Sequence, residues 1–183
     1  MRRLMDAGRV VLAWWLAVGL IVFYYSQANA QEKHRFSFST PPGVAKYTQQ
    51  HVIDVGDVPG HQVRIYEIHT KYTTEAPVYD GVKVVEAWTR GASDYTNGSG
   101  HAQNYAISVM ENGDKIFSRA EILTHALAST EGSRGSKFTT VVTLTGGTGK
   151  FKGIRGTLRS SGQTDFKTGT SGVVTEGEYW FEK

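Results

Sequence analysis

Eight extended runs, separated by short turns, are the feature that most restricts how this chain can fold. The runs are rich in Val, Ile, Thr and Tyr. They cover residues 49–56, 61–74, 81–95, 101–111, 114–126, 136–145, 154–161 and 172–182. Turn residues such as Val58-Pro59-Gly60 and Asn97-Gly98 join them, and only residues 120–129, rich in Ala, are ambiguous between strand and helix. We therefore predict an all-β fold, an eight-stranded antiparallel up-and-down β-barrel, because closure removes exposed sheet edges.

A glycine-rich stretch, residues 145–156, lies between the sixth and seventh runs. Its glycines are Gly146, Gly147, Gly149, Gly153 and Gly156. A phosphate-binding loop is disfavoured, because Phe151 stands where that motif needs Ser or Thr and no helix is expected to follow. Several glycines between two extended runs instead predict a tight, bulged corner of the sheet, with Phe151 and Ile154 turned into the core.

The same stretch resembles a known family. Gly146-Gly147-Thr148-Gly149-Lys150-Phe151, followed by Arg155-Gly156, is similar to the Gly-Gly-Thr-Gly-Lys-Phe-Arg…Ala-Arg-Gly signature of plant dirigent proteins, and allene oxide cyclases carry a related Gly-Gly-Ser-Gly corner. The resemblance implies an eight-stranded antiparallel barrel. It also implies a small apolar substrate, held while it cyclises or isomerises, and no cofactor. The catalytic residues of the two families are not matched here, and the chain has no cysteine.

The first thirty residues are typical of an export signal. Arg2, Arg3 and Arg9 precede an apolar run, and Ala28-Asn29-Ala30 fits a signal-peptidase site. We predict a signal peptide over 1–30, with an uncleaved anchor as the alternative. A polar N-terminal arm over 31–48 and a barrel domain over 49–183 would follow. The mature protein would be secreted or periplasmic, with no membrane attachment after cleavage.

Composition excludes several classes of function. There are no cysteines, so the chain has no disulfide, thiolate nucleophile or cysteine metal site. Of the formal charge of +3, the leader supplies three arginines against Asp6, or +2, which leaves the mature chain near +1. We expect no nucleic-acid partner, no metal and no cofactor; the expected partner is a small apolar molecule, and a homo-oligomer is possible.

Glu86 is the predicted catalytic residue. Strict alternation would place it on one face with Val82, Val84 and Trp88, and apolar neighbours would turn that face into the barrel. A carboxylate in such a place would have a raised pKa and could act as an acid or a base. The alternative is that Glu86 pairs with an arginine or faces water.

Five further side chains are candidate ligand-binding residues, each with a structural alternative. They are Tyr105, Trp88, Arg119, Glu121 and His69. Tyr105 and Trp88 are equally consistent with core filling, and Arg119 with Glu121 is consistent with a solvated ion pair. His69 shares a strand face with Val63, and the second run does not show which of its faces is inside.

Three functions fit these observations. The first is a cofactor-free barrel that binds a small apolar molecule and guides its cyclisation or isomerisation, as in an allene oxide cyclase-like or dirigent-like isomerase. The second is a lipocalin-like carrier without catalysis, and the third is a secreted structural or oligomeric barrel with a filled lumen. An inward carboxylate beside an open cavity would favour the first, an open cavity without one would favour the second, and a lumen filled by Trp, Phe and Tyr would favour the third.

Overall fold

The computed structural model describes residues 31–73, 75–130, 133–165 and 169–182. The predicted signal peptide, residues 1–30, lies outside the described residues. Within the described ranges no helix is long and apolar enough to cross a bilayer. Residues 33–183 form one compact unit.

The described part of this unit consists of ten strands and one short 3-10 turn. The strands are β1 (His34–Thr40), β2 (Ala45–Asp54), β3 (His61–Lys71), β4 (Val78–Tyr79), β5 (Val82–Thr96), β6 (Ser99–Met110), β7 (Lys115–Thr130), β8 (Ser133–Gly147), β9 (Ile154–Asp165) and β10 (Gly169–Phe181), with the turn η1 at Gly149–Phe151. Each of the eight predicted runs corresponds to one strand, and the ambiguous stretch 120–129 belongs to β7.

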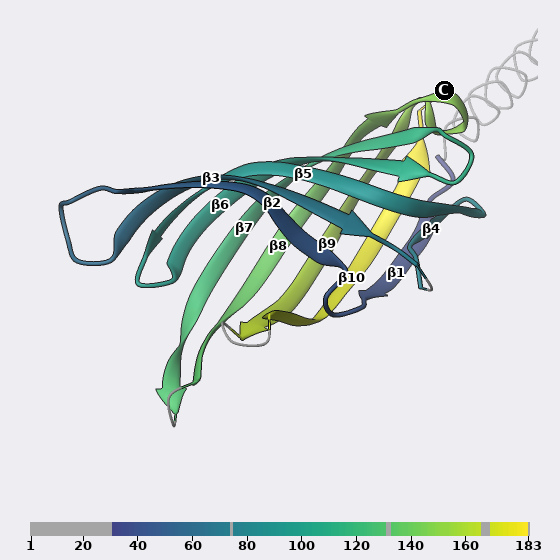
Figure 1. Ribbon diagram of the computed structural model, residues 1–183. Helices are drawn as coiled ribbons and strands as arrows, with labels where there is room; N and C mark the ends of the chain where they lie inside the picture. The colour runs from purple at the N-terminus through teal and green to yellow at the C-terminus, as the bar shows by residue number, and fades with distance from the viewer. Residues whose placement is uncertain (1–30, 74, 131–132, 166–168, 183) are drawn as a thin grey trace, which may run out of the picture. The chain divides into compact units, whose positions relative to one another are not determined.

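The strands form an antiparallel sheet in the order β1-β10-β9-β8-β7-β6-β5-β3-β2, with the short β4 paired to β5 (Figure 1). The all-β, up-and-down prediction is confirmed, because from β5 to β10 each strand pairs with the next one along the chain. The predicted number of eight strands was too low. The two additional strands are β4 and β1, and β1 lies in the segment predicted as a polar arm, where Phe36 is buried and stacks on Tyr79.

The sheet curls on itself, and the two strands at its ends, β1 and β2, follow each other along the chain. No ladder joins them among the described residues. They are connected by residues 41–44, and the five Cα–Cα steps from Thr40 to Ala45 span at most roughly 18 Å. Val44 is held to β3, because its carbonyl accepts a hydrogen bond from the Lys71 amide at 3.1 Å. The edges are therefore tied together covalently at one end, where a closed barrel would have a hydrogen-bonded seam.

One end of the barrel is filled by apolar side chains. Phe151 and Ile154 are fully buried, and Met110 and Val84 are nearly so. Around them lies the rest of the buried cluster: Phe36, Tyr79, Ile116, Leu144, Leu158 and Tyr179. We call this the packed end. Burial of this apolar surface is the main term that stabilises the fold.

The glycine stretch forms the predicted tight corner beside the packed end. Gly149 adopts φ +51°, and a Cβ there would collide with the Asp114 carboxylate. Gly147 must also lack a side chain, but for a different reason: a Cβ there would lie 2.5 Å from the Lys115 carbonyl oxygen. Lys150 donates its backbone amide to Asp114 at 3.0 Å. Phe151 and Ile154 do turn inward, as expected.

A β-bulge in β5 changes which side chains face inward. Val84 pairs with Met110 on β6, but Glu86 pairs with Val109, so Val85 is an extra residue in this strand. Val84 is buried, whereas Val85 is 41% exposed. After the bulge the alternation is shifted by one position, because one inserted residue exchanges the two faces of a strand.

Candidate functional site

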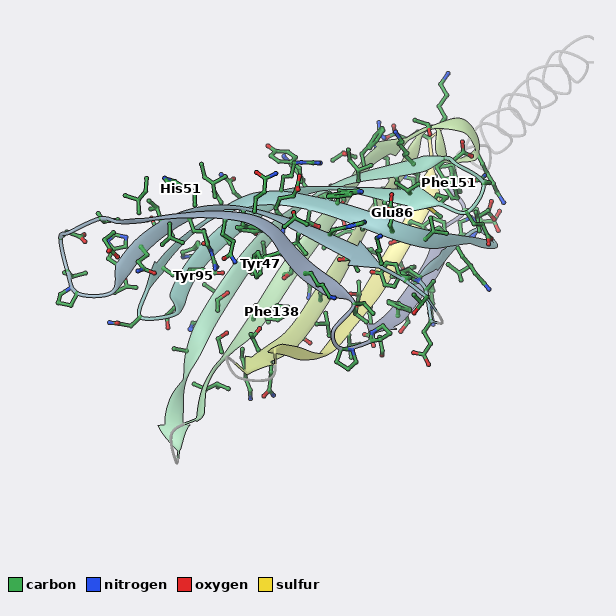
Figure 2. The ribbon with its side chains drawn as sticks, in the orientation of Figure 1. Tyr47, His51, Glu86, Tyr95, Phe138 and Phe151 are labelled. Carbon is green, nitrogen blue, oxygen red and sulfur yellow. The ribbon has the colours of Figure 1, made fainter. Side chains whose placement is uncertain are left out.

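The candidate site is the inward-facing wall at the other end of the barrel, which we call the open half. Two aliphatic residues share this face, Ile122 between Ala102 and Thr140 and Val52 opposite Arg64. Its other side chains are mostly polar, aromatic or small: Tyr47, Arg64, Tyr66, Gly91, Ser93, Tyr95, Ala102, Asn104, Thr124, Phe138, Thr140, Ser160, Gly162 and Thr175. Figure 2 shows Tyr47, Tyr95 and Phe138 on this half, away from Phe151. These residues share one face because the register carries the row Arg64, Ser93, Ala102 across β3, β5 and β6.

Arg64 is the cation of this wall. Its guanidinium lies over two aromatic rings, 5.5 Å from the centre of the Tyr47 ring and 5.7 Å from that of Tyr66. Nη1 donates to the Gln50 side-chain oxygen at 3.1 Å, and Nε lies 3.4 Å from the Ser93 hydroxyl oxygen. Cation–π contacts and these two hydrogen bonds hold the planar fork in place.

Tyr66 and Asn104 place a phenol and an amide next to this cation. Burial raises the pKa of the Tyr66 phenol, and its hydroxyl is hydrogen-bonded to the Asn104 side chain. The phenol is therefore protonated at neutral pH. Both residues pair with Gly91 in the sheet, and a Cβ at Gly91 would come within 2.7 Å of the Tyr66 hydroxyl. Gly91 is thus the position that allows the hydroxyl to lie across β5.

Two more aromatic residues, Tyr95 and Phe138, lie at the rim of the open half. The Tyr95 hydroxyl lies 2.9 Å from the hydroxyl of buried Thr124. The Phe138 ring covers Gly162, where a Cβ would approach Cζ of the ring to 2.7 Å. The wall therefore offers ring faces and a few fixed hydroxyls, a combination typical of sites for small molecules.

Glu86, the predicted catalytic residue, lies on the outer face. Because of the bulge it no longer shares a face with Val82 and Val84, and its carboxylate accepts a hydrogen bond from His69 Nε2 at 2.7 Å. This bond is the main reason that the pKa of Glu86 is lowered. The expected rise in pKa was wrong, since the carboxylate has a donor and keeps part of its contact with solvent.

The predicted ligand residues His69 and Trp88 lie beside Glu86 on this outer face. The two rings stack with centroids 3.8 Å apart, and the Arg90 guanidinium lies 5.8 Å from the Trp88 ring. Arg90 is also paired with Glu67 at 2.8 Å. These side chains form a cross-strand network on the outer face, so Trp88 does not face the inside of the barrel.

The remaining predicted ligand residues also project outward. Tyr105 is 70% exposed, and Arg119 and Glu121 alternate with the buried inward-facing Ala120 on β7. Glu121 lines an outer groove of about 600 Å³, together with Val141 and Arg159. The sequence grouping of Arg119 with Glu121 on one face was confirmed, but that face is not the lumen.

The open half contains residues that sequence reasoning did not select. Arg64 and Tyr66 are two residues apart and therefore share one face of their strand, yet nothing in that strand shows which face is inside. The inner face could have been recognised on β6, where small residues (Ala102, Ala106) alternate with exposed Gln103 and Tyr105. The sheet register then places Arg64 and Tyr66 on the same face as Ala102. No group of three or more His, Asp or Glu among the described residues could hold a metal ion.

Comparisons with known proteins add little to this geometry. No model of a protein family matches the sequence, and no curated protein matches it. Among solved structures, the pterocarpan synthase dirigent protein GePTS1 is similar at 16% identity and a TM-score of 0.42, over 86% of this chain and 91% of that one. The pterocarpan synthase dirigent protein PsPTS1 gives 17% and 0.39, over 83% and 96%. A likeness of this degree assigns no activity, and the fold is established by the strand pairing itself.

Proposed function

We propose that this protein is exported and binds a small, largely apolar molecule on the open half of its inner wall. The observation that carries the proposal is the contrast along that wall. The packed end is filled by large apolar side chains, whereas the open half has mainly glycine, alanine, serine and threonine, with Ile122 among them, between tyrosine and phenylalanine rings. A wall of this kind offers apolar contact area and a few hydrogen bonds that orient a ligand.

Binding is tested with the fluorescent apolar probe N-phenyl-1-naphthylamine and a matched pair of variants. Thr140 faces inward on β8, and its neighbour Thr139 faces outward. We expect the wild type to enhance and blue-shift the probe's emission in a saturable way. Thr140→Phe should abolish the effect because it places a ring in the open half, and Thr139→Phe should retain it. Equal binding by both variants, with both folded, would contradict the proposal.

Carriage without reaction is one form of this function. It is favoured by the outward position of Glu86, because no inward carboxylate remains on β3, β5 or β6 in the part of the chain described. A carrier would release its ligand chemically unchanged.

Guided cyclisation or isomerisation is the second form. It is favoured by Tyr66 and Asn104, a protonated phenol and an amide that could donate to a ligand oxygen without any cofactor. Chromatography of a ligand extracted from the native host, before and after incubation with the protein, separates the two forms. Export is tested independently by mass spectrometry, which should show a mature N-terminus at or near Gln31.

A further inference from the structure

We infer that the molecule bound by the open half carries an anionic oxygen group, a carboxylate or a sulfonate on an aromatic body, and that Arg64 binds this group. The inference rests on the proposed function and names its ligand class. It follows from the charge, the hydrogen-bond donors and the rings that the structure gathers at one point of the wall.

Arg64 differs in its partners from two arginines of the outer surface, Arg90 and Arg155. Arg90 is paired with Glu67 at 2.8 Å and Arg155 with Glu182 at 2.9 Å. Arg64 forms no ion pair with an acidic side chain among the described residues; its partners are the neutral groups of Gln50 and Ser93. A guanidinium has five N–H donors in a fixed fork, and these two contacts use only part of that capacity.

The surroundings of Arg64 are rich in donors and poor in acids. The inward positions of β3, β5 and β6 carry hydroxyls and an amide, from Ser93, Tyr66 and Asn104, but no Asp or Glu. Asp54 lies on the same face of β2 and pairs with Gln62, two residues from Arg64, and its carboxylate accepts a hydrogen bond from the Gln62 side chain at 2.8 Å. A cation among neutral donors, shielded from solvent on one side, is a site for a negatively charged oxygen group.

The rings beside Arg64 indicate a flat ligand. Tyr47 packs edge to face against Tyr66, with ring centroids 5.9 Å apart, and the guanidinium lies over both rings. Tyr95 and Phe138 extend this aromatic surface toward the rim (Figure 2). A planar body can stack on such a surface while its anionic group reaches the fork of Arg64.

Two dyes that differ by one charged group test the inference. The first is 8-anilinonaphthalene-1-sulfonate, and the second is N-phenyl-1-naphthylamine, which has the same aromatic skeleton without the sulfonate. Both are titrated into the wild type, Arg64→Gln and Arg64→Lys. Arg119→Gln is the matched control, because it removes one exposed arginine from the outer face.

The sulfonate dye should lose about tenfold to a hundredfold in affinity in Arg64→Gln, the usual effect of removing hydrogen bonds to a charged group. The neutral dye should change by no more than about twofold. Arg64→Lys should be intermediate for the sulfonate dye, since it retains the charge and loses the fork. Arg119→Gln should affect neither dye.

The opposite results separate this inference from the proposed function. Equal losses for both dyes in Arg64→Gln and Arg64→Lys would show that Arg64 only supports the wall, and unchanged binding of the sulfonate dye would show that it binds no anion. Either result overturns the inference while the neutral dye still binds the wild type. Failure of the wild type to bind the neutral dye would overturn the proposed function itself.

Discussion

The two ends of the inner wall share strands β5 to β10, yet they have different chemistry. The packed end adds β1, β4 and η1, and the open half adds β2 and β3. At the packed end, Phe151 and Ile154 are 0% exposed, and the cluster is apolar apart from the hydroxyls of Tyr79 and Tyr179. At the open half, Arg64 and Asn104 occupy equivalent inward positions on β3 and β6. The comparison shows that side-chain size and polarity differ between a part of the barrel that stabilises the fold and the part for which we propose ligand binding.

The sharpest test of this division compares two phenylalanines. Phe151→Ala should lower the free energy of unfolding by about 3–5 kcal/mol, because it removes a fully buried ring and leaves a cavity. Phe138→Ala, in the open half, should cost less than about 2 kcal/mol, because its ring is only partly buried. Urea unfolding measures both values, and similar losses would mean that the open half is as much a core as the packed end.

The glycine corner supports the packed end, and its role is tested by a pair of glycines. Gly149 and Gly81 both have positive φ, +51° and +78°, but only a Cβ at Gly149 collides with a neighbour, Asp114. Gly149→Val should cost about 2–4 kcal/mol, and Gly81→Val only the ~1–2 kcal/mol of backbone strain. Thermal unfolding with folded yield gives the comparison. A stable Gly149→Val variant that had lost only ligand binding would show that the corner is a site rather than a scaffold.

Much of the fold was predictable because strands repeat a simple signal. All eight runs became strands, and Phe151 and Ile154 turned inward, since turn residues and apolar alternation are local properties. Strand β1 was missed although Phe36-Ser37-Phe38-Ser39 alternates as a strand does, because this stretch is short and lies between polar residues and Pro41-Pro42-Gly43, which favour an arm. Its pairing with β10 is a long-range contact that a local pattern does not contain.

The candidate site was much less predictable. The face of Glu86 was assigned by strict alternation along β5, but the extra residue Val85 moves Glu86 to the opposite face of the strand. For Arg119 and Tyr105 the alternation was correct, but the outer face was taken for the inner one. Both faces of β6 and β7 contain apolar residues, so polarity did not distinguish them. Which face is inside depends on how the sheet curls, and that is a property of all strands together.

The loops at the mouth of the open half should be sensitive to pH, in contrast to the apolar packed end. His61 lies between two carboxylates, with Nε2 2.8 Å from Asp94 and Nδ1 2.6 Å from Asp57. Hydrogen bonds to Asp94 and then Asp57 raise the pKa of His61. Its stabilising effect should be complete below the unfolded pKa of about 6.5. It should disappear as the pH rises through the higher folded pKa.

Thermal unfolding of wild type and His61→Gln between pH 5 and pH 9 measures this effect. The difference in melting temperature should be largest at the acidic end and shrink as the pH rises. The turn contact from the Asn97 amide to the Gly60 carbonyl, 2.9 Å long, is not titratable and remains in both proteins. A difference that stayed constant across the range would show that His61 contributes by packing alone.

The smallest effect is expected at Glu86, and it tests the assignment of inside and outside directly. Glu86→Gln removes the charged partner of His69 on the outer face, where such pairs contribute less than about 1 kcal/mol. The pKa of Glu86 is lowered by this bond, so its contribution should be present above the unfolded pKa of about 4.3 and lost as the pH falls through the folded pKa. Binding of the neutral dye should be unchanged, because the carboxylate lies outside the wall that contacts the ligand. A folded Glu86→Gln variant that lost binding or turnover would place this carboxylate inside and reverse the faces of β5 beyond the bulge.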